Sequence, residues 1–481
     1  MTSLKDPKRE TVNPKGLLEL MRTQWRADST VMPKPLPEAK AFAARRKALS
    51  KRFPGEVLII PTGHEKVRAN DTHFRFRPGS DFFWLTGNHE ADCVLVMAPR
   101  GKGHEAVLFV EPNAGHSDAT FYTDRNKGAL WVGPRLGVAQ SKARYGVEQA
   151  RGLPELTKAL NEWPLARVLR GISPQVDALR SPSHERPPDK QLAEALAEMR
   201  LLKDEVEVAE LKAAIASTQR GFEDVIQALP NASNEREVEG IFSLRARVEG
   251  NDVGYGTIAA GGANACVLHW TTNDQPLKKR DLLLLDAGVE GRSLYTADIT
   301  RTVPMAGTFS PAQREIYALV WRAQQAAFEA VKPGNDFMEP NRRAMRVLAQ
   351  GLVALGILKT TADDALADQH QFYKRYSLHN ISHMLGLDVH DCARARQEVY
   401  RYGPLRPGMV LTVEPGLYFQ LDDLTVPTKY RGIGVRIEDD VLVTEAGMVN
   451  LSASIPSEAT AVERWVQTLQ KKNARRHPLK R

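Results

Sequence analysis

The chain has 481 residues, of which 42% are hydrophobic and 26% are charged. This balance is typical of a globular protein and excludes a disordered or fibrous one, and the length exceeds what one hydrophobic core usually serves, so we expect two domains. The formal charge of +8 does not indicate a nucleic-acid partner, because six of the positive charges lie in the last eleven residues, where no acid occurs. We interpret that segment as a solvated tail.

The sequence indicates a cytoplasmic protein without a membrane partner. Charges occupy the first ten residues, where a secretory signal would need an apolar stretch, and no later apolar run approaches membrane-spanning length. The cysteines Cys93, Cys266 and Cys392 are widely spaced and contain no CxxC pair. They therefore suggest neither a disulfide framework nor a thiolate metal site.

Strands dominate the first part of the chain. Apolar runs bounded by turn residues predict buried strands over 56–63, 93–99 and 106–112. A Pro-rich polar break at 181–189 is the best candidate for a domain linker. We therefore expect an N-terminal extension over 1–35, a mixed α/β domain over 36–185, a second domain over 190–465 and a basic tail over 466–481.

Helices and paired strands are mixed in the second half, which predicts the α+β class. One helix is predicted over 204–229, and cap residues ahead of an apolar-periodic run predict another that opens at Ser233. A third is expected over 310–331, with a serine N-cap and a proline at its first position. Strand-like segments lie over 281–288, 294–305, 409–419 and 433–444.

Four acids are embedded in these apolar segments, namely Asp286, Asp298, Glu414 and Glu438. A carboxylate in such a setting is costly to bury unless it is paired or bound to metal. Any one of them alone is more often a salt-bridged or edge acid. Four together, none with an obvious adjacent lysine, favour a metal cluster.

A histidine-rich segment can supply further ligands, because His379, His383 and His390 lie within twelve residues. His379 and His383 would share a face of a helix, as in a zinc protease, but the glutamate of the HExxH motif is missing. Four carboxylates with one or two imidazoles are rich in hard oxygen donors, which suits Mn²⁺ or a similar ion. A pair of such ions about 3.5 to 4 Å apart can activate a shared water and polarise a carbonyl, so hydrolysis is the implied chemistry.

Longer motifs contain these residues. The strings DAG…ADITRT, HNISHMLGLDVHD, GMVLTVEPGLYF and YRGIGVRIEDDVLVT, with ACVLHW and SDFFWLTG upstream, resemble the motifs of the aminopeptidase P and prolidase family over about residues 50 to 455. The resemblance implies a C-terminal "pita-bread" catalytic domain, in which helices cover a curved, mostly antiparallel sheet, after a mixed α/β N-terminal domain. It also implies a homo-oligomer, either a dimer or a tetramer.

The resemblance assigns roles position by position. It implies two divalent metal ions, for which Mn²⁺ is our expectation, with the ligands Asp286, Asp298, His383, Glu414 and Glu438. Asp298 and Glu438 would bridge the ions, and Glu414 would also pass a proton to the leaving proline nitrogen. The other implied catalytic residues are His269 and His390 at the scissile carbonyl, His379 at the proline pocket, and Tyr418 and Arg436 in support; Arg401 matches more weakly.

Two features leave alternatives open. The interval from Asp286 to Asp298 is twelve residues, where the family usually has eleven, and a one-residue change on a strand turns a side chain to the opposite face. The extra residue is therefore expected in the turn, within 290–293, or in a bulge. His269 lies beside Trp270 and could instead be a hydrogen-bonded core histidine.

Three functions compete. An Xaa-Pro aminopeptidase acts on peptides of three or more residues with proline second, whereas a prolidase accepts only Xaa-Pro dipeptides. A metal-free relative that binds a partner or performs other chemistry would lose ligands, and all five are present. The motifs HMLGLDVHD and YRGIGVRIEDD favour the aminopeptidase, so the predicted substrates are peptides with proline in the second position.

Overall fold

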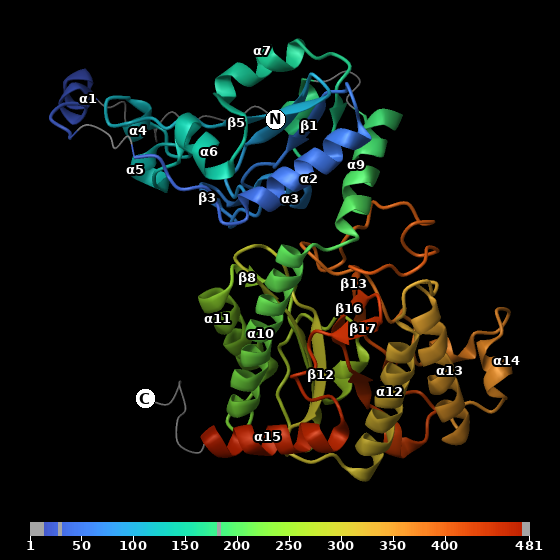
Figure 1. Cartoon of the computed structure of the whole chain (residues 1–481). Helices are drawn as coiled ribbons and strands as arrows, with labels where there is room; N and C mark the ends of the chain where they lie inside the picture. Colours follow the sequence, from blue (N-terminus) through green and yellow to red (C-terminus); the bar gives the residue numbers. More distant parts are fainter. Residues whose placement is uncertain (1–13, 27–30, 180–183, 474–481) are drawn as a thin grey trace. The chain divides into compact units, whose positions relative to one another are not determined.

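The chain forms two compact units, Met1–Ala193 and Glu194–Arg481 (Figure 1). The computed structural model describes residues 14–26, 31–179 and 184–473. The division falls inside helix α9 (Pro187–Arg200), which begins within the Pro-rich break at 181–189. Each unit has its own hydrophobic core and is described by itself.

The first unit contains a mixed five-stranded sheet with the order β6-β5-β4-β1-β7. The three predicted strands are confirmed as β1 (Leu58–Pro61), β4 (Val94–Arg100) and β5 (Gly103–Val110), which pair antiparallel. The outer strand β6 (Gln149–Gly152) pairs parallel with β5, and the other outer strand, β7 (Arg167–Val168), pairs parallel with β1. The remaining elements are α1 (Lys15–Met21), α2 (Ala39–Arg52), β2 (Val67–Ala69), β3 (Thr72–His73), α3 (Ser80–Thr86), α4 (Thr120–Thr123), α5 (Ala129–Val132), α6 (Gly137–Tyr145), α7 (Leu156–Asn161) and α8 (Pro174–Ala178).

The second unit is built on antiparallel strands, as the α+β expectation requires. Two three-stranded sheets have the orders β12-β10-β9 and β13-β16-β17, and two-stranded sheets join β11 to β8 and β14 to β15. The strands are β8 (Asp252–Val253), β9 (Ile258–Gly261), β10 (Leu282–Ala287), β11 (Val289–Glu290), β12 (Ile299–Pro304), β13 (Val410–Val413), β14 (Gly416–Tyr418), β15 (Gly434–Arg436), β16 (Asp439–Thr444) and β17 (Gly447–Asn450).

Helices flank these strands. Figure 1 shows α10 and α11 on one side, α12 and α13 on the other, and α15 along the lower edge of the unit. The helices are α10 (Glu205–Ala228), α11 (Glu235–Glu249), α12 (Pro311–Ala330), α13 (Glu339–Ala354), α14 (Ala362–Leu366) and α15 (Ala459–Asn473). Ser310 caps α12 as predicted, and Asp204 is the N-cap of α10. Helix α11 starts one residue later than expected, with Asn234 as its N-cap.

The C-terminal helix changes the expected boundary of the basic tail. Residues 466–473 belong to α15, and the side chains of Val466 and Leu469 are buried in the core of the second unit. This part of the expected tail is therefore helical and packed, while 474–481 lie outside the described residues. No described helix is long and apolar enough to cross a membrane.

Candidate active site

The second unit contains a cavity of about 790 Å³. Nine of the ten site residues predicted from the sequence line this cavity, and the tenth, Tyr418, forms a hydrogen bond with one of them. The nine are Asp286, Asp298, His383, Glu414, Glu438, His269, His379, His390 and Arg436. Segments that are far apart in the sequence thus meet around one space.

Two of the acids project from a single β-hairpin. Asp286 lies in the ladder between β10 and β12, and the bridge between Glu290 and Thr296 continues that ladder in the same register. The hairpin therefore contains no bulge, and the extra residue of the interval is accommodated in the turn at 291–295. Because antiparallel pairing keeps alternate residues on one face, Asp286 and Asp298 both point into the cavity.

The potential metal ligands converge on one point. Donor atoms of Asp298, His383 and Glu438 all lie within 4.8 Å of one another. The Nε2 atom of His383 is 3.2 Å from Asp298 Oδ2 and 3.6 Å from Glu414 Oε1. The Nδ1 atom of His383 donates to the backbone carbonyl of Met384 at 3.1 Å, so Nε2 is the nitrogen that faces the carboxylates.

The acids of the cavity destabilise one another as anions. Burial, followed by the charge of Asp298, raises the pKa of Glu438 well above its usual range. Burial raises the pKa of Glu414 to about 7. Among the residues that line the cavity, Arg401 and Arg436 are the permanent cations. A set of clustered oxygen donors with so little positive charge fits divalent metal ions, which would supply the missing charge.

A hydrogen-bonded chain connects one acid to a histidine across the cavity. Arg436 Nη2 lies 2.5 Å from Asp286 Oδ2, and Arg436 Nη1 donates to the Tyr418 hydroxyl at 3.0 Å. His379 Nδ1 donates to the Asn380 carbonyl at 2.9 Å, so its Nε2 accepts from the Tyr418 hydroxyl at 2.8 Å. Burial, with a contribution from Arg436, lowers the pKa of His379 to about 4, and this histidine is therefore neutral at pH 7.

The two remaining histidines are exposed to the cavity. His269 is exposed, so the alternative of a core histidine is wrong. The ring of His390 lies 4.2 Å from that of His383, and burial lowers the pKa of His390. The segment from His379 to His390 contains no helix. A zinc-protease helix is therefore excluded by the backbone as well as by the missing glutamate.

Comparison with known proteins places the chain in a family. The model described as "Aminopeptidase P, N-terminal domain" matches residues 42–167, and "Metallopeptidase family M24" matches residues 209–445. Xaa-Pro aminopeptidase 1 of Streptomyces coelicolor is 48% identical over 457 residues, which cover 94% of this chain and 92% of that protein. The chain belongs to the aminopeptidase P family.

Structures and further relatives agree with this membership. The Xaa-Pro aminopeptidase of Escherichia coli is 34% identical over 88% of this chain and 96% of that protein. A solved structure of E. coli aminopeptidase P with the inhibitor Pro-Leu has a TM-score of 0.81 at 32% identity, covering 91% of this chain and all of that one. The predicted pita-bread architecture and the metallopeptidase class are confirmed.

Two side chains that hold the acids of this aminopeptidase P family member were missed from the sequence. The Tyr255 hydroxyl donates to Asp286 Oδ1 at 2.7 Å, and the Thr300 hydroxyl donates to Glu438 Oε2 at 2.6 Å. Thr300 lies two residues after Asp298, on the same strand face, and this alternation could have identified it. Tyr255 precedes β9 and gave no local signal.

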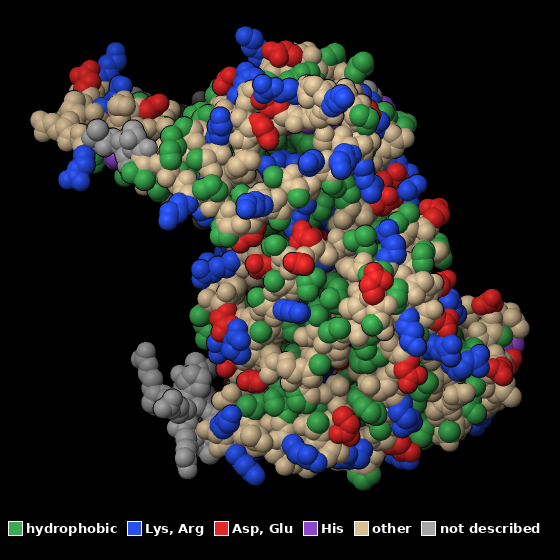
Figure 2. Space-filling view, viewed as in Figure 1, with side chains coloured by type: hydrophobic (Ala, Val, Ile, Leu, Met, Phe, Trp, Pro, Cys, Tyr) green, Lys and Arg blue, Asp and Glu red, His purple; other side chains and the backbone are tan. Residues whose placement is uncertain are grey.

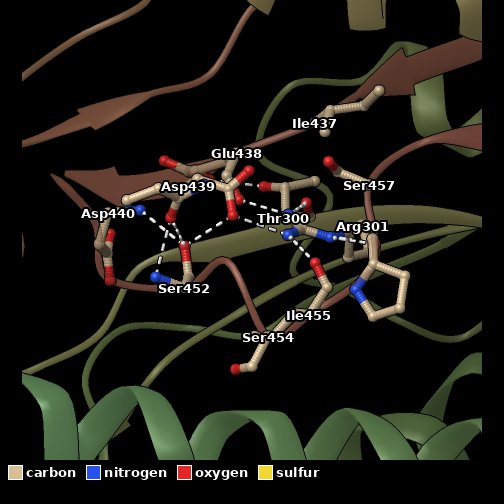
Figure 3. A network of polar contacts seen from close by, with 12 residues as sticks. Thr300, Arg301, Ile437, Glu438, Asp439, Asp440, Ser452, Ser454, Ile455 and Ser457 are labelled. Carbon is tan, nitrogen blue, oxygen red and sulfur yellow. Dashed lines mark hydrogen bonds and ion pairs between the residues drawn. The ribbon is translucent and has the colours of Figure 1, made fainter. Parts of the chain in front are cut away.

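A buried ion pair holds the backbone behind Glu438. Figure 3 shows the guanidinium of Arg301 among the residues that follow Glu438 and the segment around Ile455. Arg301 donates to the backbone carbonyls of Glu438 at 2.6 Å and Ile455 at 2.8 Å, and to Asp439 Oδ1 at 2.7 Å. Asp439 also accepts from the Ser452 hydroxyl at 2.6 Å. Because Arg301 and Asp439 are fully buried, each satisfies a charge that would otherwise be costly.

Proposed function

We propose that this chain is an Xaa-Pro aminopeptidase that removes the N-terminal residue from peptides with proline in the second position. The observation that carries the proposal is the meeting of five oxygen and imidazole donors in one cavity, beside the His379–Tyr418 pair. The relatives named Xaa-Pro aminopeptidase and the matched N-terminal domain support it. The substrates are therefore peptides rather than free amino acids or nucleic acids.

We assign five ligands to two divalent ions, for which Mn²⁺ is the expected metal. Asp298 and Glu438 would contact both ions, Asp286 would hold one ion, and His383 with Glu414 would hold the other. The separation between the donor atoms of Asp298, His383 and Glu438 supports a shared position for the bridging acids. Four of the five ligands are carboxylates, which suits a hard ion better than a soft one.

The side chains around the ligands have complementary roles in the proposed reaction. When bound, the ions polarise the scissile carbonyl and lower the pKa of water. His379, neutral and oriented by Tyr418, flanks the proline ring, while His269 and His390 stabilise the negative charge that develops on the carbonyl oxygen. Glu414 passes a proton from the attacking water to the proline nitrogen. The water oxygen bonds to the carbonyl carbon, the C–N bond breaks, and the peptide that begins with proline leaves as a secondary amine.

Substrate length separates this proposal from prolidase. Proline has no N–H and makes a tertiary amide, so either enzyme needs a cavity that fits its ring. A prolidase must also bind the free carboxylate of proline, and Arg401 on the cavity wall is a candidate clamp. We expect Xaa-Pro-Yaa tripeptides to be cleaved with higher kcat/KM than Xaa-Pro dipeptides. Cleavage of dipeptides alone would identify a prolidase with the same metal site.

Removal of either exposed histidine is expected to affect rate rather than metal binding. A group that stabilises developing charge acts mainly in the transition state, so kcat of His269→Ala and of His390→Ala should fall by roughly 10² or more. Metal analysis and thermal unfolding of the same preparations provide the control. Loss of metal or of folding in both variants would show that these histidines have structural roles instead.

The assembly and the compartment are proposals as well. We propose a homo-oligomer, supported by the exposed apolar side chains of Leu130, Trp131 and Val132 on α5. Light scattering of the purified chain, which measures its mass in solution, tests this proposal.

We also propose that the protein is located in the cytoplasm, which agrees with three free and buried cysteines.

A further inference from the structure

His269 is carried by a long connection between β9 and β10 that forms no strand of its own. The connection begins with a short 3-10 helix, Gly262–Cys266, and continues to the start of β10 at Leu282. The imidazole of His269 makes no hydrogen bond to any side chain or backbone group within the described residues. Its position in the cavity therefore depends on how the connection itself is anchored.

One carboxylate anchors this connection at four places. Glu235 Oε1 accepts hydrogen bonds from the Gly261 N–H and from the Asn264 side chain, each at 2.8 Å. Glu235 Oε2 accepts from the Trp270 indole N–H at 2.8 Å and from the Gln275 N–H at 3.0 Å. One donor is the last residue of β9, the other three lie in the connection, and one of these three is Trp270, directly after His269.

The chemistry of this carboxylate is unusual for a buried acid. Glu235 is fully buried, yet no lysine or arginine among the described residues pairs with it. The four N–H donors satisfy both of its oxygens, which offsets the cost of burying the group. Its position in the first turn of α11 adds the favourable field of the helix N-terminus.

The cap of α11 does not explain this residue. Asn234 is the N-cap, and its side chain accepts from the Glu237 N–H at 3.2 Å. Glu237 in turn accepts from the Asn234 amide and from the backbone of Ser233. The helix start is also tied to the connection through its backbone, because the Glu235 N–H donates to the Gln275 carbonyl at 3.1 Å and the Leu277 N–H donates to the Ser233 carbonyl at 3.0 Å. The Glu235 carboxylate takes no part in the cap, and both of its oxygens accept from the end of β9 and from the connection that carries His269.

We propose that Glu235 is a positioning residue for His269, and that it fixes the backbone on both sides of this histidine so that the imidazole faces the substrate carbonyl. The connection is also held at Cys266, because the Gln420 amide donates to the Cys266 carbonyl at 2.9 Å. Trp270 and Leu268 pack against the same small cluster as Tyr418. The inference rests on the proposed function, in which His269 acts on the reaction.

The test replaces the carboxylate by an amide of the same size. In Glu235→Gln the new NH₂ group faces two N–H donors, so part of the connection loses its anchor. We expect kcat on an Xaa-Pro-Yaa tripeptide to fall by about ten- to hundredfold, with unchanged metal content. Glu237→Gln is the matched control, because Glu237 lies on the same turn and its carboxylate accepts hydrogen bonds from Ser233 and Asn234, not from the connection. Its kcat should stay at the wild-type value.

A double variant shows whether Glu235 acts through His269. If it does, Glu235→Gln combined with His269→Ala should have the kcat of His269→Ala alone, within about twofold. Trp270→Phe removes one of the four donors and keeps an aromatic ring at this position, so it should lower kcat less than Glu235→Gln does. If Glu235→Gln does not fold, the kcat of Trp270→Phe decides whether the anchor of the connection matters. Multiplying effects in the double variant, loss of metal, or wild-type kcat in the single variants would overturn the proposal. Cleavage of the tripeptide by the wild-type protein tests the proposed function separately, because it does not depend on any of these variants.

Discussion

Asp298→Ala and Glu438→Ala variants are expected to lose at least one metal ion and to turn over substrate at near-background rates. Both acids lie beside His383, and their donor atoms belong to the same group within 4.8 Å. As proposed bridges, they contact both ions, so removing either one affects the whole centre. The fall in rate should exceed the roughly 10- to 100-fold loss that follows removal of a supporting residue. Elemental analysis and steady-state kinetics on the same samples measure both effects.

The neighbouring acid Asp439 provides the contrast. It follows Glu438 directly, but its carboxylate pairs with Arg301 at 2.7 Å and accepts from the Gln324 amide at 2.9 Å. Removing one partner of a buried ion pair costs about 3–5 kcal/mol of stability, so Asp439→Asn should unfold at a lower denaturant concentration than the wild type. Per folded molecule, it should lose much less activity than Asp298→Ala or Glu438→Ala. Two retained metals and near-normal rates in both bridge variants would contradict the ligand assignment.

The acids of the site were predictable because their signal is local. A carboxylate after four leucines, as at Asp286, or after the run Val-Leu-Thr-Val, as at Glu414, is a conflict between burial and charge that is visible without a structure. The paired strands β10 and β12 follow from the same segments. Strand alternation predicts the extra residue in the turn or in a bulge, and the observed register shows that it lies in the turn. Burial patterns and caps therefore predicted most elements of the second unit.

The residues that hold the acids were less predictable, because their partners lie far away along the chain. Arg301 and Asp439 are separated by more than a hundred residues and pair only after folding, and the bond from Tyr255 to Asp286 has no sequence pattern. The tail shows the opposite error. Val462, Val466 and Leu469 have helical spacing and are buried, whereas the cluster of positive charges that follows them predicts a solvated tail.

A strong chelator is expected to abolish activity, and added Mn²⁺ is expected to restore it. Covalent catalysis needs a nucleophile hydrogen-bonded to a base, and the hydroxyl of Ser382, which lines the cavity, has no hydrogen-bond partner among the described residues. The thiol of Cys266 is buried, and burial raises its pKa to about 12. Neither group can replace the metal-dependent route that we propose.

Chelation should also lower the thermal stability of the protein, which gives a readout independent of turnover. Glu438 is buried and Glu414 is partly buried near Asp298, and burial together with the charge of Asp298 raises the pKa of Glu438. A ligand that binds only the folded state stabilises it by about 2.7 kcal/mol at a concentration of 100 Kd, so the apo protein should unfold at a lower temperature, and Mn²⁺ should reverse the shift. The Asp298→Ala variant is the matched control, because its Tm should respond less to Mn²⁺. Full activity in a preparation shown to contain no metal would exclude the proposed mechanism, whatever the Tm.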